Sequence, residues 1–250
     1  IFMRYFGSQR SVGLVNIPGR TFPVEDYYLD DVIRYTSFAP ELAEEYEDEE
    51  ELPRGEETLG KALRSLGMGI NYDLIAATVE YIDAQLGNQP GGILIFLPGT
   101  LEIDKCLNAV KRIPDMHPLP LHASLLPAEQ RRVFQSAPRG KRKVIAATNV
   151  AETSITIEDV VAVIDTGRVK ETSYDPKDNM VRLQEVWASQ AACKQRRGRA
   201  GRVRAGICYK LYTRKAESNM APRPDPEIRR VPLEQLCLSV KSMKGIEDVA

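Results

Sequence analysis

The stretch GGILIFLPGTLEIDKCLNAVKRI (91–113) decides the fold class of this chain. Its run ILIFL (93–97) is short and wholly apolar, as is typical of a parallel strand that is buried on both faces. Pro98-Gly99-Thr100 predicts a turn, and LEIDKCLNAVKRI (101–113) predicts the helix that follows it. A strand, a turn and a helix in this order form the repeating unit of an α/β fold.

The same alternation continues on both sides of this stretch. NYDLIAATVEYIDAQL (71–86) has apolar residues at helical spacing, with Asn71 or Asp73 available as the N-cap and Gly91-Gly92 as the end signal. Further patterns predict strands at 119–121, 144–148, 160–165 and 206–212, and a helix at 127–135. We therefore expect an α/β fold, with a parallel sheet covered by helices on both faces.

The chain divides into four parts around this sheet. Residues 1–36 predict a strand followed by an extended linker, and residues 37–69 an acidic insertion. Residues 70–220 hold the sheet, together with a projecting hairpin over 169–186 whose turn falls at 175–179. Residues 221–250 begin with prolines, and the amphipathic VPLEQLCLSVKSM (231–243) predicts a helix that opens another domain.

Composition excludes several classes of protein. No apolar run approaches the roughly 18 residues of a membrane span, and the four cysteines lack zinc-ligand spacing, so we predict no metal site. The net charge of -1 hides two opposed blocks, because eight of eleven residues in 41–51 are acidic and six of eleven in 194–204 are basic. Mutual repulsion predicts a flexible, solvated loop for the acidic block, with a docking role as the alternative.

Polar clusters follow four of the predicted strands. Because the carboxyl ends of parallel strands meet at one edge of the sheet, these clusters share that edge. They contain Gly99 and Thr100, then His122 and Ser124, then Asn149, Glu152, Thr153 and Ser154, and then Gly167 and Arg168. Small polar residues in such places also cap helices, but four clusters on one edge favour a surface that binds nucleic-acid phosphates.

The basic block contains QRRGRAGR (195–202), in which glycines separate the arginines. Arginine presents a planar fork of donors that matches phosphate oxygens and keeps its charge near neutral pH. If the segment is one helix, Gln195, Arg199 and Arg202 share a face and can bracket a terminal phosphate with its attacking water. The alternative is a solvated basic helix or an unspecific nucleic-acid patch.

In combination, these patterns resemble the DEAH/RHA group of superfamily 2 ATP-dependent RNA helicases. The matching segments are QRRGRAGR for motif VI, ATNVAETSITI (147–157) for motif V, ILIFLPGTLEID (93–104) for motif IV, VIDTGRVKE (163–171) for the segment after motif V, IPGRTFPVE (17–25) for the linker leaving the first RecA-like lobe, and PEIRRVPLEQLCL (226–238) for the entry to the winged-helix domain. QRRGRAGRV together with RVPLEQLCL points to the RHA-like branch. The resemblance implies a second RecA-like lobe, a projecting β-hairpin and the start of a winged helix.

The resemblance also implies roles for single residues. Gln195, Arg199 and Arg202 match the residues that reach the ATP γ-phosphate, with the arginines as fingers. Phe134 matches the aromatic residue that stacks on adenine, where core packing is the alternative. The positions implied to touch the RNA backbone are Gly99, Thr100, Ser124, Asn149 and Thr153. The hairpin near 172–183 matches the strand-separating hairpin of the family, or else merely extends a sheet.

Two positions depart from the family pattern. Glu158 stands where the group often has Asp near the ribose, and Asp159 follows it, so both are candidates for contact with ATP. Pro98 precedes Gly99, and Thr100-Leu101 replaces the usual Gln-Glu, which favours a backbone contact at motif IV over a side-chain contact.

The motifs of a first lobe are absent from the sequence. No GxxxxGK[ST] cradle and no DExH follows an apolar strand, so the resemblance implies a piece of a longer helicase. ATP, its Mg²⁺, RNA, the first lobe and the C-terminal domains would be its partners. The expected compartment is the cytoplasm, with the nucleus as the alternative. A non-catalytic nucleic-acid-binding module remains the alternative function. A Rossmann dinucleotide enzyme is disfavoured because no GxGxxG follows a strand.

Overall fold

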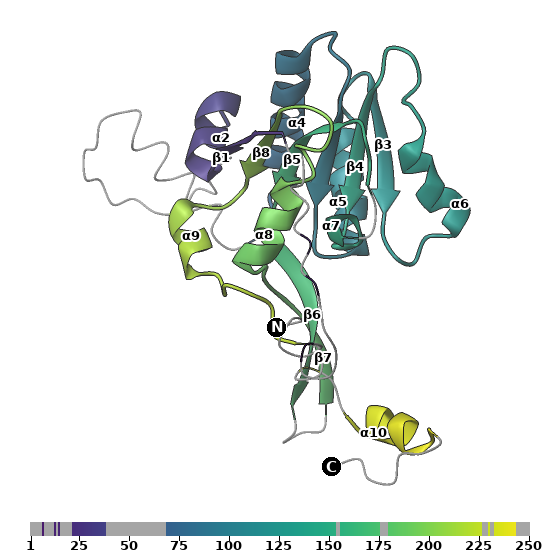
Figure 1. Cartoon of the computed structure of the whole chain (residues 1–250). Coiled ribbons are helices and arrows are strands. Elements are labelled where there is room, and N and C mark those ends of the chain that lie inside the picture. Colours follow the sequence, from purple (N-terminus) through teal and green to yellow (C-terminus); the bar gives the residue numbers. More distant parts are fainter. Residues whose placement is uncertain are drawn as a thin grey trace, which may run out of the picture.

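A computed structural model describes most of the chain, namely residues 7, 13, 15, 22–38, 69–153, 156–175, 180–226, 230 and 233–243 (Figure 1). The predicted acidic loop at 41–51 and the hairpin turn at 176–179 lie outside these residues. None of the helices in the described part of the chain has the length and hydropathy that a membrane span requires.

Six parallel strands form the sheet. Their order is β1 (Val24–Tyr27), β8 (Gly206–Lys210), β5 (Val160–Asp165), β2 (Gly92–Phe96), β4 (Arg142–Ala147) and β3 (Met116–Leu121). The predicted strands are therefore confirmed, and the sheet is parallel throughout. β3 contains Pro118 and Pro120, which have no backbone N–H to donate, and it lies at an edge of the sheet, where prolines are tolerated.

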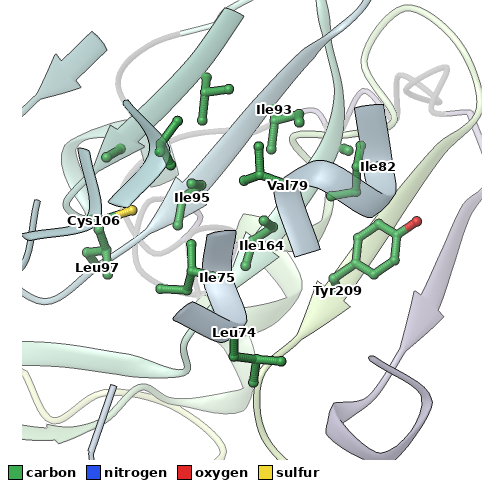
Figure 2. Packing of buried hydrophobic residues seen from close by; sticks show 14 of the residues in the cluster. Leu74, Ile75, Val79, Ile82, Ile93, Ile95, Leu97, Cys106, Ile164 and Tyr209 are labelled. Carbon is green, nitrogen blue, oxygen red and sulfur yellow. The ribbon is translucent and has the colours of Figure 1, made fainter. Parts of the chain in front are cut away.

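Side chains of successive residues in the central strands enter two different cores. Ile93 and Ile95 pack in one core with helices α2 (Leu29–Thr36), α4 (Tyr72–Leu86) and α5 (Thr100–Val110). Figure 2 shows Ile75, Val79 and Ile82 of α4 beside these strand residues. Leu94 and Phe96 point to the opposite face and pack in a second core. Both faces of the sheet are covered, which explains why β2 is wholly apolar.

The ends of α4 follow from its sequence. The Asn71 side-chain oxygen accepts a hydrogen bond from the backbone N–H of Leu74 at 2.8 Å, so Asn71 is the N-cap. The helix ends at Gly87, whose φ of 51° suits a residue without a Cβ. The expectation that Gly91-Gly92 ends this helix is wrong, since Gly92 already begins β2.

Residues 24–36 do not form an extended linker. Val24–Tyr27 make β1, which pairs in parallel with β8, and α2 buries Leu29, Val32 and Ile33 in the first core. The N-terminal part of the described chain therefore belongs to the same sheet as residues 70–220. β1 lies at the edge of the sheet, and its sequence VEDY carries two acidic residues, so it lacks the apolar run that indicates a buried strand.

The second face of the sheet is covered by short elements. These are α6 (Pro127–Gln130), the 3₁₀ helix η1 (Arg131–Phe134), α7 (Val150–Thr153) and α8 (Gln190–Arg197). Val133 of η1 and Ala151 of α7 enter the second core, as do Ile157 and Ala200 from the adjoining segments. The predicted helix at 127–135 is thus present as α6 followed by η1.

A two-stranded antiparallel hairpin extends from the sheet (Figure 1). It consists of β6 (Arg168–Asp175) and β7 (Met180–Trp187), as the sequence predicts. A third apolar cluster secures its base, and this cluster contains Val169, Ala188, Cys193, Tyr212 and Met220. Two further helices, α9 (Arg214–Asn219) and α10 (Glu234–Lys241), complete the described elements; α10 matches the helix predicted from residue 231.

Candidate functional site

The strand-end edge carries the residues expected to touch RNA. Gly99 and Thr100 follow β2, Ser124 follows β3 and Asn149 follows β4, and these strands are parallel neighbours. The side chains of Thr100, Ser124 and Asn149 are exposed, which leaves them accessible to a ligand. Thr153 is the last residue of α7, and its side chain is not among those that the structure describes. The predicted clustering on one edge is confirmed, while contact with RNA stays a prediction.

Gly99 is buried where the hairpin approaches helix α5. A Cβ at this position would lie 2.7 Å from Glu102 Oε2 and 2.8 Å from Lys170 Nζ. Lys170 of β6 and Glu102 of α5 form an ion pair at 2.8 Å, so the space beside Gly99 is already filled. Glycine therefore lets the hairpin dock against the start of α5.

The motif VI segment, residues 195–202, is not one helix. Ser189 caps α8 by accepting from the N–H of Ala192, and the helix ends at Arg197 with Gly198 as its C-cap. The expectation that Gln195, Arg199 and Arg202 share a helix face is therefore wrong. Gln195 and Arg202 are exposed, whereas Arg199 is 6% exposed.

Arg196 lies at the centre of a buried charge cluster. Its guanidinium is fully buried, with Nη1 2.9 Å from Asp165 Oδ1 and Nε 3.2 Å from Glu152 Oε2. Burial opposes the charge, but the attraction of Asp165 and Glu152 outweighs it and raises the pKa of Arg196. Arg196 therefore pairs with carboxylates inside the fold and does not face solvent.

Arg197 pairs with the edge strand β1. Its Nε lies 2.7 Å from Asp26 Oδ1, and its guanidinium also donates to the carbonyl of Val24. The side chain remains about a third exposed, in contrast to that of Arg196. Arg197 therefore attaches the end of α8 to β1.

Arg199 is held by helix α7. Its guanidinium donates a hydrogen bond to the backbone carbonyl of Glu152. Burial lowers the pKa of Arg199, as does the neighbouring charge of Arg202, while Glu152 opposes both effects. Arginine remains charged near neutral pH despite such a shift, so Arg199 and Arg202 are two adjacent cations suited to phosphate oxygens.

The residues expected to contact ATP outside motif VI are Phe134, Glu158 and Asp159, and Lys143 contacts Asp159 and the neighbour of Phe134. Phe134 is 53% exposed, so it does not serve as a core residue. Lys143 Nζ donates to the carbonyl of Val133 at 2.9 Å and forms an ion pair with Asp159 at 2.8 Å. Lys143 thus brings Asp159 close to the residue that precedes Phe134. An exposed ring beside polar groups fits a nucleobase, whereas Asp159 already has a cationic partner and Glu158 is exposed.

Sequence reasoning missed the inner members of the charge cluster. Glu152 was expected only as part of a polar cluster at the strand-end edge, not as a partner of Arg196, and Asp165, which ends an apolar strand, received no role. An acid at the end of a buried strand is a usable signal, because a buried carboxylate needs a partner. No group of three or more metal-ligating side chains occurs among the residues that the structure describes.

Residues 73–204 match the model of the helicase conserved C-terminal domain, which is more than half of the 250 residues. The chain belongs to the helicase C-terminal domain family. The resemblance stated from motifs IV to VI is thereby confirmed.

Individual relatives support this membership. The chain is 50% identical over 242 residues to ucp12 of Schizosaccharomyces pombe, which covers 96% of the chain and 17% of that protein. It is 38% identical to the DExH-box ATP-dependent RNA helicase DExH1 of Arabidopsis thaliana and 37% identical to the human ATP-dependent DNA/RNA helicase DHX36, covering 98% and 97% of the chain and 27% of each relative. The chain thus spans only about a sixth to just over a quarter of their length.

A solved structure supports the fold. The DExH-box NTPase HrpB of E. coli aligns with a TM-score of 0.66 and 30% sequence identity, over 89% of this chain and 23% of that one. The RecA-like α/β fold predicted for the second lobe is therefore confirmed.

Proposed function

We propose that this helicase C-terminal domain works as the second lobe of an ATP-dependent RNA helicase. The names of DExH1 and DHX36 describe helicases that depend on ATP, and the chain is 38% and 37% identical to them over nearly its whole length. A first RecA-like lobe would supply the phosphate cradle and bind Mg²⁺, and further C-terminal domains would follow. The observation that carries the proposal is the placement of two different polar surfaces on one sheet.

The first surface fits a triphosphate. Arg202 and Gln195 are exposed, Arg199 is held beside them by α7, and the exposed ring of Phe134 lies on the same side of the sheet. ATP would supply the phosphoanhydride bond whose cleavage drives the motion. The two arginines would stabilise the negative charge on the transferred phosphoryl group, which is the usual contribution of arginine fingers.

The second surface fits the backbone of RNA. The exposed hydroxyls of Thr100 and Ser124, the amide of Asn149 and the start of α5 at Gly99 lie along the strand-end edge. Such donors recognise phosphates and sugars without reading the bases. Closing of the two lobes around ATP would therefore shift the RNA that this edge holds.

The direct test uses the full-length protein and the isolated 250-residue chain. We expect ATP turnover stimulated by single-stranded RNA in the full-length protein and no turnover above trace in the isolated chain. Turnover by the isolated chain would overturn the division of labour between two lobes. RNA binding without any ATP turnover in the full-length protein would favour a non-catalytic binding module instead.

A further inference from the structure

Helix α7 lies between the strand-end edge and the motif VI segment. It begins directly after Asn149, one of the residues expected to hold RNA, and it contains Glu152. The Glu152 side chain is only 14% exposed, and it points away from solvent toward α8. Its carboxylate contacts Arg196 at 3.2 Å, and its backbone carbonyl accepts from Arg199. One residue of α7 therefore contacts two arginines of motif VI.

Arg196 is fixed to the end of the sheet. Its guanidinium bonds to Asp165, the last residue of β5, and to the carbonyl of Arg168, the first residue of β6. Asp165 also accepts from the N–H of Gly167 at 2.8 Å and from the hydroxyl of Tyr212 at 3.3 Å. With this many partners, Arg196 is a rigid reference point at the sheet edge.

Arg199 is attached to α7 by the Glu152 carbonyl. The ion pair between Glu152 and Arg196 sets the distance between α7 and the rigid sheet edge, and thereby the place of this carbonyl. Any displacement of α7 against the sheet moves the carbonyl and the Arg199 guanidinium together. An RNA backbone that contacts Asn149 acts on the same four-residue helix.

We propose that Glu152 is a positioning residue that couples RNA contact at α7 to the placement of Arg199. This inference rests on the proposed function, since it assumes that RNA binds at the strand-end edge and that Arg199 serves ATP hydrolysis. Coupling between two sites requires an element that both sites bias, and α7 meets that requirement by its contacts.

The test is Glu152→Gln in the full-length protein, because this substitution removes the charge and keeps the length of the side chain. ATP turnover is measured with and without a single-stranded poly-uridine oligonucleotide, and affinity for the oligonucleotide with and without a non-hydrolysable ATP analogue. We expect the ratio of RNA-stimulated to RNA-free turnover to fall at least about fivefold, the lower end of typical coupling. The change in RNA affinity that the ATP analogue causes should also become smaller in this variant. RNA affinity without nucleotide should stay within about threefold of the parent.

Asp26→Asn is the matched control. It removes a carboxylate from Arg197 on the same helix α8 without touching α7, and it should leave the stimulation ratio unchanged. The proposal is overturned if Glu152→Gln keeps the parent ratio of RNA-stimulated to RNA-free turnover, even where both rates fall in equal proportion. A parent protein with no RNA-stimulated turnover would overturn the proposed function itself, and a thermal unfolding scan separates both results from loss of folding.

Discussion

The motif VI segment contains two pairs of arginines whose surroundings differ. Arg196 and Arg197 lie in the last turn of α8, and both form ion pairs with carboxylates of the sheet. Arg199 and Arg202 lie beyond Gly198, where the helix has ended, and beside each other closely enough to influence the pKa of Arg199. The first pair builds the fold, whereas in the second pair Arg199 is bonded to α7 and Arg202 is exposed.

This difference shows how a short basic sequence can serve two purposes. A continuous helix would place residues 195, 199 and 202 on one face. Ending the helix at Gly198 instead allows Arg199 to reach α7 while Arg202 remains exposed. Four substitutions test whether the two regions are separate, from the largest expected effect to the smallest.

Arg196→Ala should have the largest effect on stability. It leaves two buried or nearly buried carboxylates, Asp165 and Glu152, without their cation. Removing one partner from a buried ion pair costs about 3 to 5 kcal/mol of unfolding free energy. Urea denaturation of the 250-residue chain, followed by circular dichroism, measures this loss. A change below about 1 kcal/mol would mean that Arg196 does not organise the fold.

Arg199→Ala should affect catalysis and, to a smaller extent, stability. Loss of an arginine finger is expected to slow ATP turnover of the full-length protein by at least about 100-fold, or about 2.7 kcal/mol. Because the guanidinium is buried and donates to Glu152, we also expect about 1 to 3 kcal/mol of destabilisation. RNA binding without nucleotide should survive. Weakened RNA binding with normal turnover would assign Arg199 to the RNA surface instead.

Arg202→Ala should slow turnover as strongly as Arg199→Ala without destabilising the chain. The Arg202 side chain is exposed, so we expect its removal to change the unfolding free energy by less than about 0.5 kcal/mol. Steady-state ATP turnover and urea denaturation separate the two readouts. Arg204→Ala is the matched control, since Arg204 lies in the same loop but donates to the carbonyl of Pro90. An equal loss of turnover in both variants would contradict a specific role for Arg202.

Arg197→Ala should have the smallest effect. Its ion pair with Asp26 is partly exposed on both sides, and such pairs contribute about 0 to 1 kcal/mol. The same denaturation experiment measures it beside Arg196→Ala. If the two variants lose equal stability, burial does not distinguish the structural roles of the neighbouring arginines.

Much of the fold could be predicted because the information is local. The strand β2 is wholly apolar, and the helix α4 shows both its apolar spacing and its cap at Asn71. The strand-end edge followed from the parallel arrangement alone, since polar residues after parallel strands must meet. In these elements, the apolar pattern and the capping residue lie close together in the sequence.

The remainder depends on partners that are distant in the sequence. Arg196 is buried because Asp165 and Glu152, 31 and 44 positions away, reach it. The end of α8 at Gly198 could not be predicted because the basic segment lacks apolar residues that would reveal a period. β1 is short and acidic, and only its pairing with β8 makes it a strand. For these residues the three-dimensional environment decides the conformation.

The pairing of β1 with β8 also constrains how the chain is made. Val24 lies opposite Gly206, so β1 leaves the ribosome roughly 180 residues before its only partner strand in the described sheet. At translation rates of about 5 to 20 residues per second, β1 waits on the order of 10 to 40 seconds for that partner. During this interval its backbone groups face solvent or a chaperone. The domain therefore completes its sheet only near the end of its own synthesis, when the last parallel strand emerges.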